Sequence, residues 1–440
     1  MTAIRNRNRL HPLASAPTGF KFDSPILVVE DQKSTAEYTV ALMKDRWGCE
    51  VLVADSLKAA KAALDSTLPA IKVAICDLNL PDAPYGEVID LMNQYGVAAI
   101  ALTGAYGEEL RTSLNKKGVV DFIPKGSVNA YEYTVGLAGR VQKNFHTSIL
   151  VVDDSLSARA LYKHMCELLR CKVFTASNGY QALELLSQHP EISMMLTDYS
   201  MSGMDGYELT ANTRAKYSKD KLAIIGISAG ADEEISSNFL KCGANDFLAK
   251  PFSYQEFLCR IHQNLDMLDL IQANRDAAQR DYMTGLYNRR FFFEAGTTLY
   301  DQAKLNRSGI VAAMIDLDFF KKINDQYGHD CGDLVIKHFA ALLNSHFKEM
   351  LVARIGGEEF AVLLDVPYSE EVYAQFEALR TAVYSSSIDF AGEKISYTIS
   401  VGLSCQLGET IDDLIKGADI ALYQSKKGQR NQVVAPIGSF

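Results

Sequence analysis

A short apolar run that ends in acidic residues occurs twice in this chain. Ile26–Val29 is followed by Glu30 and Asp31, and Ile149–Val152 is followed by Asp153 and Asp154. Further matched residues lie 121 to 125 positions apart, and they pair Asp77 with Asp198, Thr103 with Ser228, Phe122 with Phe247, and Lys125 with Lys250. A period of this length is too long for a solenoid repeat, so it indicates a duplicated domain.

Each copy alternates short apolar strands with amphipathic helical stretches. In the second copy we expect strands near residues 148–152, 171–175, 192–197, 222–227 and 244–248. Strands that are apolar throughout and separated by helices predict a parallel sheet covered by helices on both faces. Each acidic residue follows a strand, so the acids gather at the carboxyl edge of the sheet, where open α/β sheets bind ligands.

Three carboxylates, a hydroxyl and a lysine are expected to meet at that edge in each copy. Crowded carboxylates repel one another unless a cation joins them, and all-oxygen ligands suit Mg²⁺. Such a set predicts phosphoryl transfer, in which the central aspartate attacks phosphorus while metal and lysine absorb the charge. The expected members are Glu30, Asp31, Asp77, Thr103 and Lys125 in the first copy, and Asp153, Asp154, Asp198, Ser228 and Lys250 in the second.

These residues resemble the receiver domain of bacterial response regulators over about residues 24–146 and 147–265. The resemblance implies two flavodoxin-like doubly wound α/β domains. It also implies that Asp77 and Asp198 accept a phosphoryl group from a cognate histidine kinase, and that Phe122 and Phe247 are aromatic switch residues. An alternative is a receiver used only as an adaptor or a dimerisation surface.

The second copy fits the receiver pattern better than the first. It has the pair Asp153-Asp154, the run 198–206 and Lys250-Pro251. In the first copy Glu30 replaces an aspartate, Gly126 follows the lysine, and residues 83–85 lengthen the loop after the aspartate.

The segments that flank the two copies have a different character. Residues 1–23 lack periodicity and predict a flexible tail. Apolar residues recur every three or four positions from Phe257 to Ile271, and this apolar stripe predicts a helix. Residues 266–280 are expected to form a helical linker. The stripe either pairs with its counterpart in a homodimer or packs only on its own domain.

The third domain, residues 281–440, carries two acidic strand ends. A strand near 310–315 leads into Asp316, and two strands near 351–354 and 360–364 flank Gly356-Gly357. The second pattern predicts a hairpin with Glu358 and Glu359 at its tip, where glycines let a ligand approach the backbone. Asp316 and Glu358 can hold two divalent cations, which activate a hydroxyl and stabilise a leaving phosphate.

The signature Gly356-Gly357-Glu358-Glu359-Phe360 resembles the diguanylate cyclase (GGDEF) family, and the resemblance covers residues 281–440. It implies an α+β ferredoxin-like, nucleotide-cyclase-type palm. It further implies condensation of two GTP molecules into cyclic di-GMP with release of two pyrophosphates. Asp316, the Leu317 carbonyl and Glu358 would hold Mg²⁺, with Mn²⁺ as an alternative metal.

The resemblance also implies the substrate contacts and the catalytic set. Guanine would be read by Asn324 and Asp333, and the phosphates would be bound by Lys321, Lys426 and Arg430. The catalytic residues would be Asp316, Glu358 and Glu359, with Glu359 serving either metal binding or proton transfer.

Two positions refine the expected activity. Asp333 can accept hydrogen bonds from N1–H and the amino group of guanine, and adenine lacks both donors, so we expect GTP to be preferred over ATP. Residues 347–350 read Phe-Lys-Glu-Met instead of the Arg-x-x-Asp of the family's inhibitory product site. We therefore expect little product inhibition there.

Composition narrows the partners and the compartment. The net charge of −10 argues against a duplex-wrapping nucleic-acid binder. No apolar run reaches the ~18–20 residues that span a bilayer, and no signal-peptide core follows the N-terminal arginines. The eight cysteines show no C-x-x-C spacing. We expect a cytoplasmic homodimer with GTP and a histidine kinase as partners, no nucleic acid and no membrane insertion.

Two other hypotheses remain open at this point. One is a catalytically silent scaffold or phosphorelay protein whose third domain only binds nucleotide or a partner. The other is a constitutive cyclase whose receivers only assemble it. Intact acids at positions 316 and 358 favour a two-component regulator with cyclase activity, controlled by receiver phosphorylation and dimerisation.

Overall fold

The computed structural model describes residues 22–66, 70–104, 114, 117–127, 129–229 and 233–435. The chain divides into two units, residues 1–273 and 274–440. The tail expected over residues 1–23 lies outside the described residues except for its last two. Phe22 and Asp23 belong to the folded region, because the Phe22 ring lies 5.6 Å from that of Trp47 and Asp23 pairs with Lys72.

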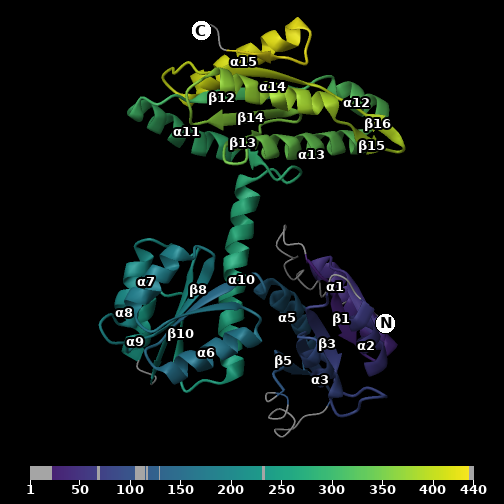
Figure 1. The fold of residues 1–440 in the computed structure, drawn as a ribbon, viewed down its shortest axis with the longest axis vertical. Helices are drawn as coiled ribbons and strands as arrows, with labels where there is room; N and C mark the ends of the chain where they lie inside the picture. The colour runs from purple at the N-terminus through teal and green to yellow at the C-terminus, as the bar shows by residue number, and fades with distance from the viewer. Residues whose placement is uncertain are drawn as a thin grey trace, which may run out of the picture. The chain divides into compact units, whose positions relative to one another are not determined.

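The first α/β region, residues 22–146, contains a five-stranded parallel sheet (Figure 1). Its described elements are β1 (Ile26–Val29), α1 (Lys33–Trp47), β2 (Val51–Ala54), α2 (Leu57–Ser66), β3 (Val73–Asp77), α3 (Glu87–Gln94), β4 (Ala98–Thr103), β5 (Asp121–Pro124) and α5 (Ala130–Asn144). The strand order is β2-β1-β3-β4-β5. Alternate residues of β1 enter two cores, one shared with α1 and α5 and one shared with α2 and α3. The sheet is therefore covered on both faces.

The second α/β region, residues 147–265, repeats this architecture. Its elements are β6 (Ser148–Val152), α6 (Leu156–Leu168), β7 (Lys172–Ala176), α7 (Gly179–Gln188), β8 (Ile192–Asp198), α8 (Gly206–Arg214), β9 (Ala223–Ala229), α9 (Glu233–Lys241), β10 (Asp246–Lys250) and α10 (Tyr254–Gln279). The order β10-β9-β8-β6-β7 is that of the first sheet read from its other edge. The five strands predicted from the sequence are confirmed, and each begins within two residues of the expected position.

Helix α10 extends well beyond the second α/β region. The predicted linker, residues 266–280, is the continuation of this one helix, and the boundary between the two units falls inside it. Phe257, Ile261 and Leu265 are buried in the core of the N-terminal unit, whereas Met267 and Leu270 are about half exposed. The first part of the apolar stripe therefore packs on its own unit.

The two α/β regions share one apolar core. Leu137, Ala138 and Val141 of α5 belong to the same buried cluster as Cys166 and Leu169, which lie in and just after α6. Helix α5 is mostly buried. The first region is therefore packed on the second through α5, and burial of this apolar surface stabilises the pair.

A buried cationic pair reinforces this contact. Arg140 of α5, whose side chain is 5% exposed, donates from Nε to Asp266 at 2.8 Å and also pairs with Asp269 of α10. Lys143 lies 2.9 Å from Asp269. Burial would raise the pKa of Asp269, but Arg140 and Lys143 lower it below the usual range. The carboxylate is thus held in its charged form opposite two cations.

The C-terminal unit contains a mixed six-stranded sheet of order β11-β13-β14-β12-β17-β18 and a separate pair, β15 with β16. Its elements are β11 (Tyr287–Asn288), α11 (Arg289–Asn306), β12 (Val311–Leu317), α12 (Phe320–Tyr327), α13 (His329–His346), β13 (Leu351–Arg354), β14 (Glu359–Leu364), α14 (Glu370–Ser385), β15 (Ile388–Phe390), β16 (Glu393–Ile395), β17 (Ile399–Ser404), α15 (Ile411–Gly428) and β18 (Val433–Val434). The hairpin predicted over 351–364 is confirmed as antiparallel β13 and β14.

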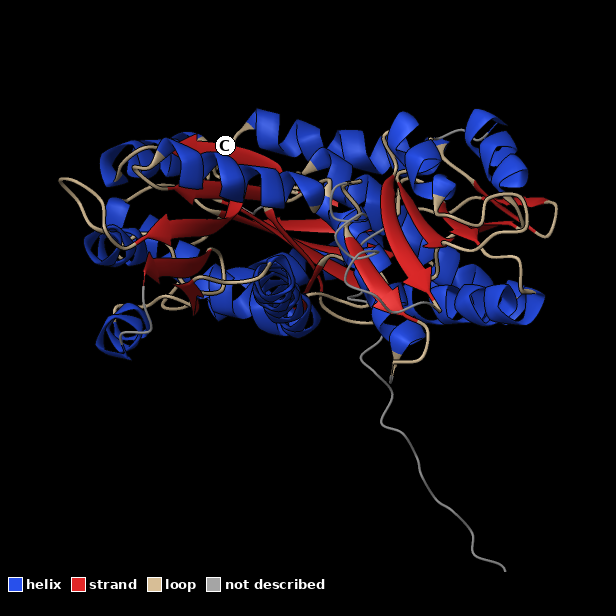
Figure 2. Ribbon diagram, turned by 90° about the horizontal axis from the view of Figure 1, so that it is seen from below, coloured by secondary structure: helices blue, strands red, loops and turns tan. Residues whose placement is uncertain are grey.

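Alternation along the central strand β12 builds the core of this unit. Ile315 and Leu317 join a cluster with α13 and α14, and Ala312 and Met314 join a cluster with α11 and α15. Helices therefore cover both faces of this sheet. Figure 2 colours the helices of the chain blue and its strands red. This layering presents the end of β12, with its acids, at the edge of the sheet.

Two further observations concern the chain as a whole. No helix within the described ranges has the length and apolar character that a bilayer crossing needs. All eight cysteines are free, and five of them are buried, whereas Cys259 is exposed.

We predict that Arg140→Met weakens the packing between the two α/β regions. The substitution leaves Asp266 and Asp269 without their shared cation, and we expect a loss of about 2 kcal/mol, less than for a fully buried pair because Asp266 is largely exposed. Urea unfolding followed by Trp47 fluorescence measures this loss, because Trp47 is the chain's single tryptophan and its ring centroid lies 5.2 Å from Lys143 Nζ.

The matched control is Lys163→Met, which breaks an exposed pair with Glu167. We expect its effect to stay within about 0.5 kcal/mol. Equal stabilities of the two variants would show that Arg140 contributes nothing to the contact.

Candidate functional site

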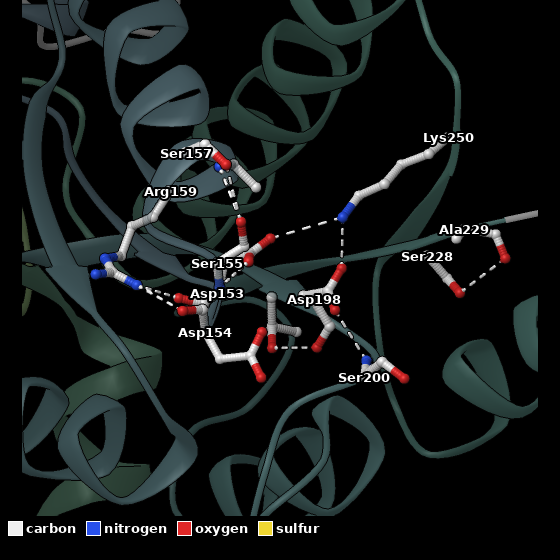
Figure 3. A network of polar contacts seen from close by, with 12 residues as sticks. Asp153, Asp154, Ser155, Ser157, Arg159, Asp198, Ser200, Ser228, Ala229 and Lys250 are labelled. Carbon is white, nitrogen blue, oxygen red and sulfur yellow. Dashed lines mark hydrogen bonds and ion pairs between the residues drawn. The ribbon is translucent and has the colours of Figure 1, made fainter.

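The predicted acids of the second α/β region meet at the carboxyl edge of its sheet. Asp153 directly follows β6, Asp198 ends β8 and Lys250 ends β10. Lys250 Nζ lies 2.7 Å from Asp198 Oδ1 and 3.6 Å from Asp153 Oδ2. Figure 3 shows the ammonium group reaching both carboxylates. The chain thus brings a cation and two acids together from three separate strands.

Backbone amides orient the two carboxylates. Ser155 N donates to Asp153 at 2.8 Å, and Ser200 N donates to Asp198 at 2.9 Å (Figure 3). Burial raises the pKa of Asp153, and the charge of Asp198 adds to this. Burial would lower the pKa of Lys250, but its pairing with Asp198 raises the pKa above the usual range. The cluster carries more negative charge than one lysine offsets, which suits a divalent cation.

The remaining predicted residues of this region lie around the same edge. Asp154 is exposed beside Asp153, and Ser228 is buried near the end of β9. The ring of Phe247 is half-buried and lies 5.8 Å from that of Phe239. A hydroxyl is therefore available on β9, which pairs with the strand of Asp198, and an aromatic ring on β10, which pairs with β9.

The first α/β region repeats the cluster with a glutamate in the first position. Lys125 Nζ lies 2.8 Å from Glu30 and 2.7 Å from Asp77. The carboxylates of Glu30, Asp31 and Asp77 lie within 4.8 Å of one another, close enough to share a metal ion. Burial raises the pKa of Glu30. The longer Glu30 side chain therefore reaches the place that Asp153 occupies in the second region.

Two more predicted residues complete this first cluster. Thr103 is buried at the end of β4, and Phe122 on β5 is half-buried beside the core on the α2–α3 side. The lengthened loop after Asp77 folds back on itself, because Leu80 and Ala83 exchange backbone hydrogen bonds. The inserted residues are thus accommodated outside the cluster.

In the C-terminal unit, strand pairing sets the acids side by side. Antiparallel β12 and β14 place Asp316 opposite Glu359, and Leu317 N donates to the Glu358 carbonyl at 3.2 Å. Asp316 is buried, whereas Glu358 and Glu359 are half-exposed. The end of β12 and the tip of the hairpin therefore form one acidic site.

Lys426 of α15 is the cation at this site. Its Nζ lies 2.7 Å from Asp316 Oδ2. Burial raises the pKa of Asp316 to about 6, and the charges of Glu358 and Glu359 contribute while Lys426 opposes them. Carboxylate oxygens from Asp316, at the end of β12, and from Glu358, directly before β14, are of the kind that suits a divalent cation.

Sequence reasoning missed the residues that brace the hairpin. Arg354 donates to the carbonyls of Gly356 and Gly357, at 3.1 and 2.7 Å, and its other terminal nitrogen lies 3.1 Å from Asp281. Burial would raise the pKa of Asp281, but bonds from Thr284 and Arg354 lower it. No local pattern in the sequence indicates that Asp281 and Arg354 pair.

The predicted guanine residues lie on two successive helices. Asn324 on α12 packs against Gly332 on α13, next to Asp333, and a Cβ at Gly332 would lie 1.9 Å from Asn324 Oδ1. That oxygen is buried and has no hydrogen-bond donor among the described residues. Lys321 is exposed on α12. The structure thus brings the Asn324 amide against Gly332, the residue directly before Asp333.

The two predicted phosphate residues occupy different settings. Lys426 lies on α15, but the helix ends at Gly428, so Arg430 lies in the turn that follows. The guanidinium carbon of Arg430 lies 4.5 Å from the ring centroid of Phe319. Arg430 therefore lies outside the helix that carries Lys426.

Comparison with known proteins follows these boundaries. Residues 278–432 match the family model of the diguanylate cyclase GGDEF domain, and residues 149–262 match that of the response regulator receiver domain. The chain is 33% identical over 320 residues to the response regulator PleD of Caulobacter vibrioides, which covers 68% of this chain and 66% of PleD. It is 35% identical over 193 residues to diguanylate cyclase A of Treponema denticola, which covers 41% of this chain and 51% of that enzyme.

A solved structure gives the same result. The crystal structure of a putative two-component system response regulator/GGDEF domain protein is 36% identical, with a TM-score of 0.53, and the match covers 56% of this chain and 99% of that one. The chain therefore belongs to the response regulators that carry a GGDEF domain, and it is homologous to diguanylate cyclases.

Proposed function

We propose that this protein is a two-component response regulator that condenses two GTP molecules into cyclic di-GMP and releases two pyrophosphates. The observation that carries the proposal is the acidic site, where buried Asp316 lies opposite Glu359 of β14, with Glu358 directly before that strand and Lys426 beside Asp316. A silent nucleotide-binding scaffold would not need a buried acid whose pKa burial and two neighbouring carboxylates raise.

Asp316, the Leu317 carbonyl and Glu358 are the residues that would hold Mg²⁺ or Mn²⁺. A bound metal supplies activation of the 3′-hydroxyl and stabilisation of the leaving pyrophosphate. Glu359 lies opposite Asp316 in the strand register and is placed to accept a proton or to support the metal. Lys426, whose Nζ lies 2.7 Å from Asp316 Oδ2, would supply positive charge to the phosphates of GTP at the same place.

GTP would bind with its base between α12 and α13. Asn324 and Asp333 offer acceptors for the N1–H and amino group of guanine, and these donors are absent from adenine. An unpaired buried acceptor costs about 1–3 kcal/mol, so we expect GTP to be preferred over ATP. Lys321, Lys426 and Arg430 supply positive charge for the triphosphate.

The reaction needs two copies of the chain. Each 3′-hydroxyl must attack the α-phosphate of the other GTP, and one GGDEF domain holds one GTP. We therefore propose that the active form is a homodimer in which two such domains face each other. GTP and a phosphorylated kinase would both meet the protein in the cytoplasm.

The first α/β region would be a second receiver domain. It shares the strand order of the second region, and Lys125 bridges Glu30 and Asp77 as Lys250 joins Asp153 and Asp198. In each region the aspartate oxygen would attack the phosphorus of a kinase phosphohistidine, and the imidazole would leave. Phosphorylation adds about −1.5 to −2 charge and redraws the contacts of the hydroxyl and the aromatic switch residue.

The metal residues are tested by Glu358→Gln in the full-length protein. The variant keeps the shape of the hairpin but removes a charged ligand, so we expect cyclic di-GMP formation to fall by about 100-fold or more. Chromatography of the products measures this rate, and Glu393→Gln, an exposed acid on β16, serves as a control with unchanged activity. Full activity of Glu358→Gln would contradict the assignment.

The receiver proposal is tested by adding a small phosphoryl donor with Mg²⁺. We expect the rate of cyclic di-GMP formation to rise several-fold in the wild type, and Asp198→Asn to abolish most of this rise. Asp77→Asn measures how much of this rise depends on the first region. Asp55→Asn is the control, because Asp55 is another carboxylate at the same sheet edge as Asp77. A wild-type rate that ignores the donor would favour a constitutive cyclase.

The guanine pocket is tested by Gly332→Ala. The added Cβ would displace the Asn324 amide, and we expect the KM for GTP to rise about tenfold, equivalent to one lost hydrogen bond. Gly296→Ala on α11 is the matched control, because its Cβ would crowd only the end of Ile411. An unchanged KM in Gly332→Ala would place guanine elsewhere.

A further inference from the structure

Asp318 is a buried carboxylate that none of the roles above uses. It lies between β12, which carries Asp316, and α12, which carries Asn324, and its side chain is 0% exposed. An ionised group at such a position is costly unless several donors satisfy it. Its donors therefore indicate what the residue holds in place.

Two segments supply those donors. Thr398 Oγ1 donates to Asp318 Oδ2 and Ser400 Oγ donates to Oδ1, each at 2.7 Å, from the region of β17. Asn431 N donates to Oδ2 at 3.0 Å from the turn after α15. Arg430 Nε lies 3.9 Å from Oδ1. The carboxylate thus links the central sheet to the turn that carries Arg430.

That turn has an unfavourable backbone. Arg430 has φ of 58° and Asn431 has φ of 44°, so two successive residues other than glycine are left-handed. This conformation costs about 1 kcal/mol or more for each residue, and a hydrogen bond to a charged acceptor, as from Asn431 N to Asp318, offsets part of the cost. Arg430 N donates to the Ser425 carbonyl of α15 at 3.2 Å, so the turn is held both by the end of the helix and by Asp318.

The ring of Phe319 is the second support of the guanidinium group. Phe319 follows Asp318 in the chain, is half exposed, and has Arg430 over its ring at 4.5 Å. A carboxylate and an aromatic face from adjacent residues therefore both contact one side chain. These residues lie two and three positions after Asp316, so they fix Arg430 relative to the expected metal ligand.

We propose that Asp318 is a positioning residue that holds Arg430 in place to bind the triphosphate of the substrate. This inference rests on the proposed function, since it assumes that GTP binds beside Asp316. At 3.9 Å the contact from Nε to Asp318 is an ion pair, and it leaves the terminal nitrogens for a bidentate contact with phosphate oxygens. Removing the charge of Asp318 would loosen Arg430 without removing it.

The test is a double-mutant cycle on the full chain with Asp318→Asn and Arg430→Met. We expect Asp318→Asn alone to raise the KM for GTP about tenfold, with kcat within about threefold of the wild type. In the Arg430→Met background, Asp318→Asn should change KM by less than about twofold, because the two residues act together. If the two substitutions change KM independently, so that their fold-changes multiply in the double variant, Asp318 serves only the fold and the proposal is overturned.

Phe319→Leu gives a second route if Asp318→Asn does not fold. The ring is half exposed, so the variant should fold, and we expect a two- to fivefold rise in KM that disappears with Arg430→Met. The control is Asp413→Asn, which removes a carboxylate that accepts from Thr410 N and Glu409 N at the start of α15. It should lower the melting temperature and leave KM unchanged.

The proposed function and this inference fail in different ways. Wild-type protein that makes no cyclic di-GMP from GTP and Mg²⁺ would overturn the proposed function. The cycle can then be measured on GTP binding by calorimetry, where independent effects of the two substitutions would overturn the role of Asp318. Coupled effects on binding would support it.

Discussion

Each candidate site depends on acids placed at the end of a buried strand. Burial raises the pKa of Glu30, Asp153 and Asp316, and neighbouring carboxylates add to the effect. A strand buried on both faces leaves its last residue at the sheet edge with little water around it, so the charge there must be met by a cation. In each of the three clusters a lysine from another element meets it, and each cluster also suits a divalent ion. The same arrangement therefore serves two parallel sheets and one mixed sheet.

The charged contacts of α5 also pair buried charges with opposite charges, although they lie outside the candidate sites. Arg140 and Lys143 are buried, and both face acids of α10. The first α/β region is therefore joined to the helix that continues from the second by both apolar packing and ion pairs. Helix α5 of the first region contacts α10 directly. We expect a change caused by phosphorylation in that region to reach α10 through this contact, and we expect α10 to be the place where the receivers act on dimerisation.

Much of this could be predicted from the sequence, because the patterns are local. The strands of the second region follow from their apolar runs, and the acids follow from the strands. The hairpin follows from Gly356-Gly357 between two apolar segments. What could not be predicted depends on contacts between distant residues. Nothing in the local sequence indicates that Arg140 is buried against Asp269, or that Arg354 braces the hairpin through Asp281.

The pairing of Lys426 with Asp316 has a consequence for the binding of a metal ion. In a site built only of acids, the carboxylates would repel one another until a divalent cation bound between them. Here a side chain of the same chain acts as a tethered counter-ion, 2.7 Å from the buried acid. The charge of Asp316 is therefore partly neutralised within the folded chain itself, and a divalent cation at this acid would compete with an ammonium group that is already in place.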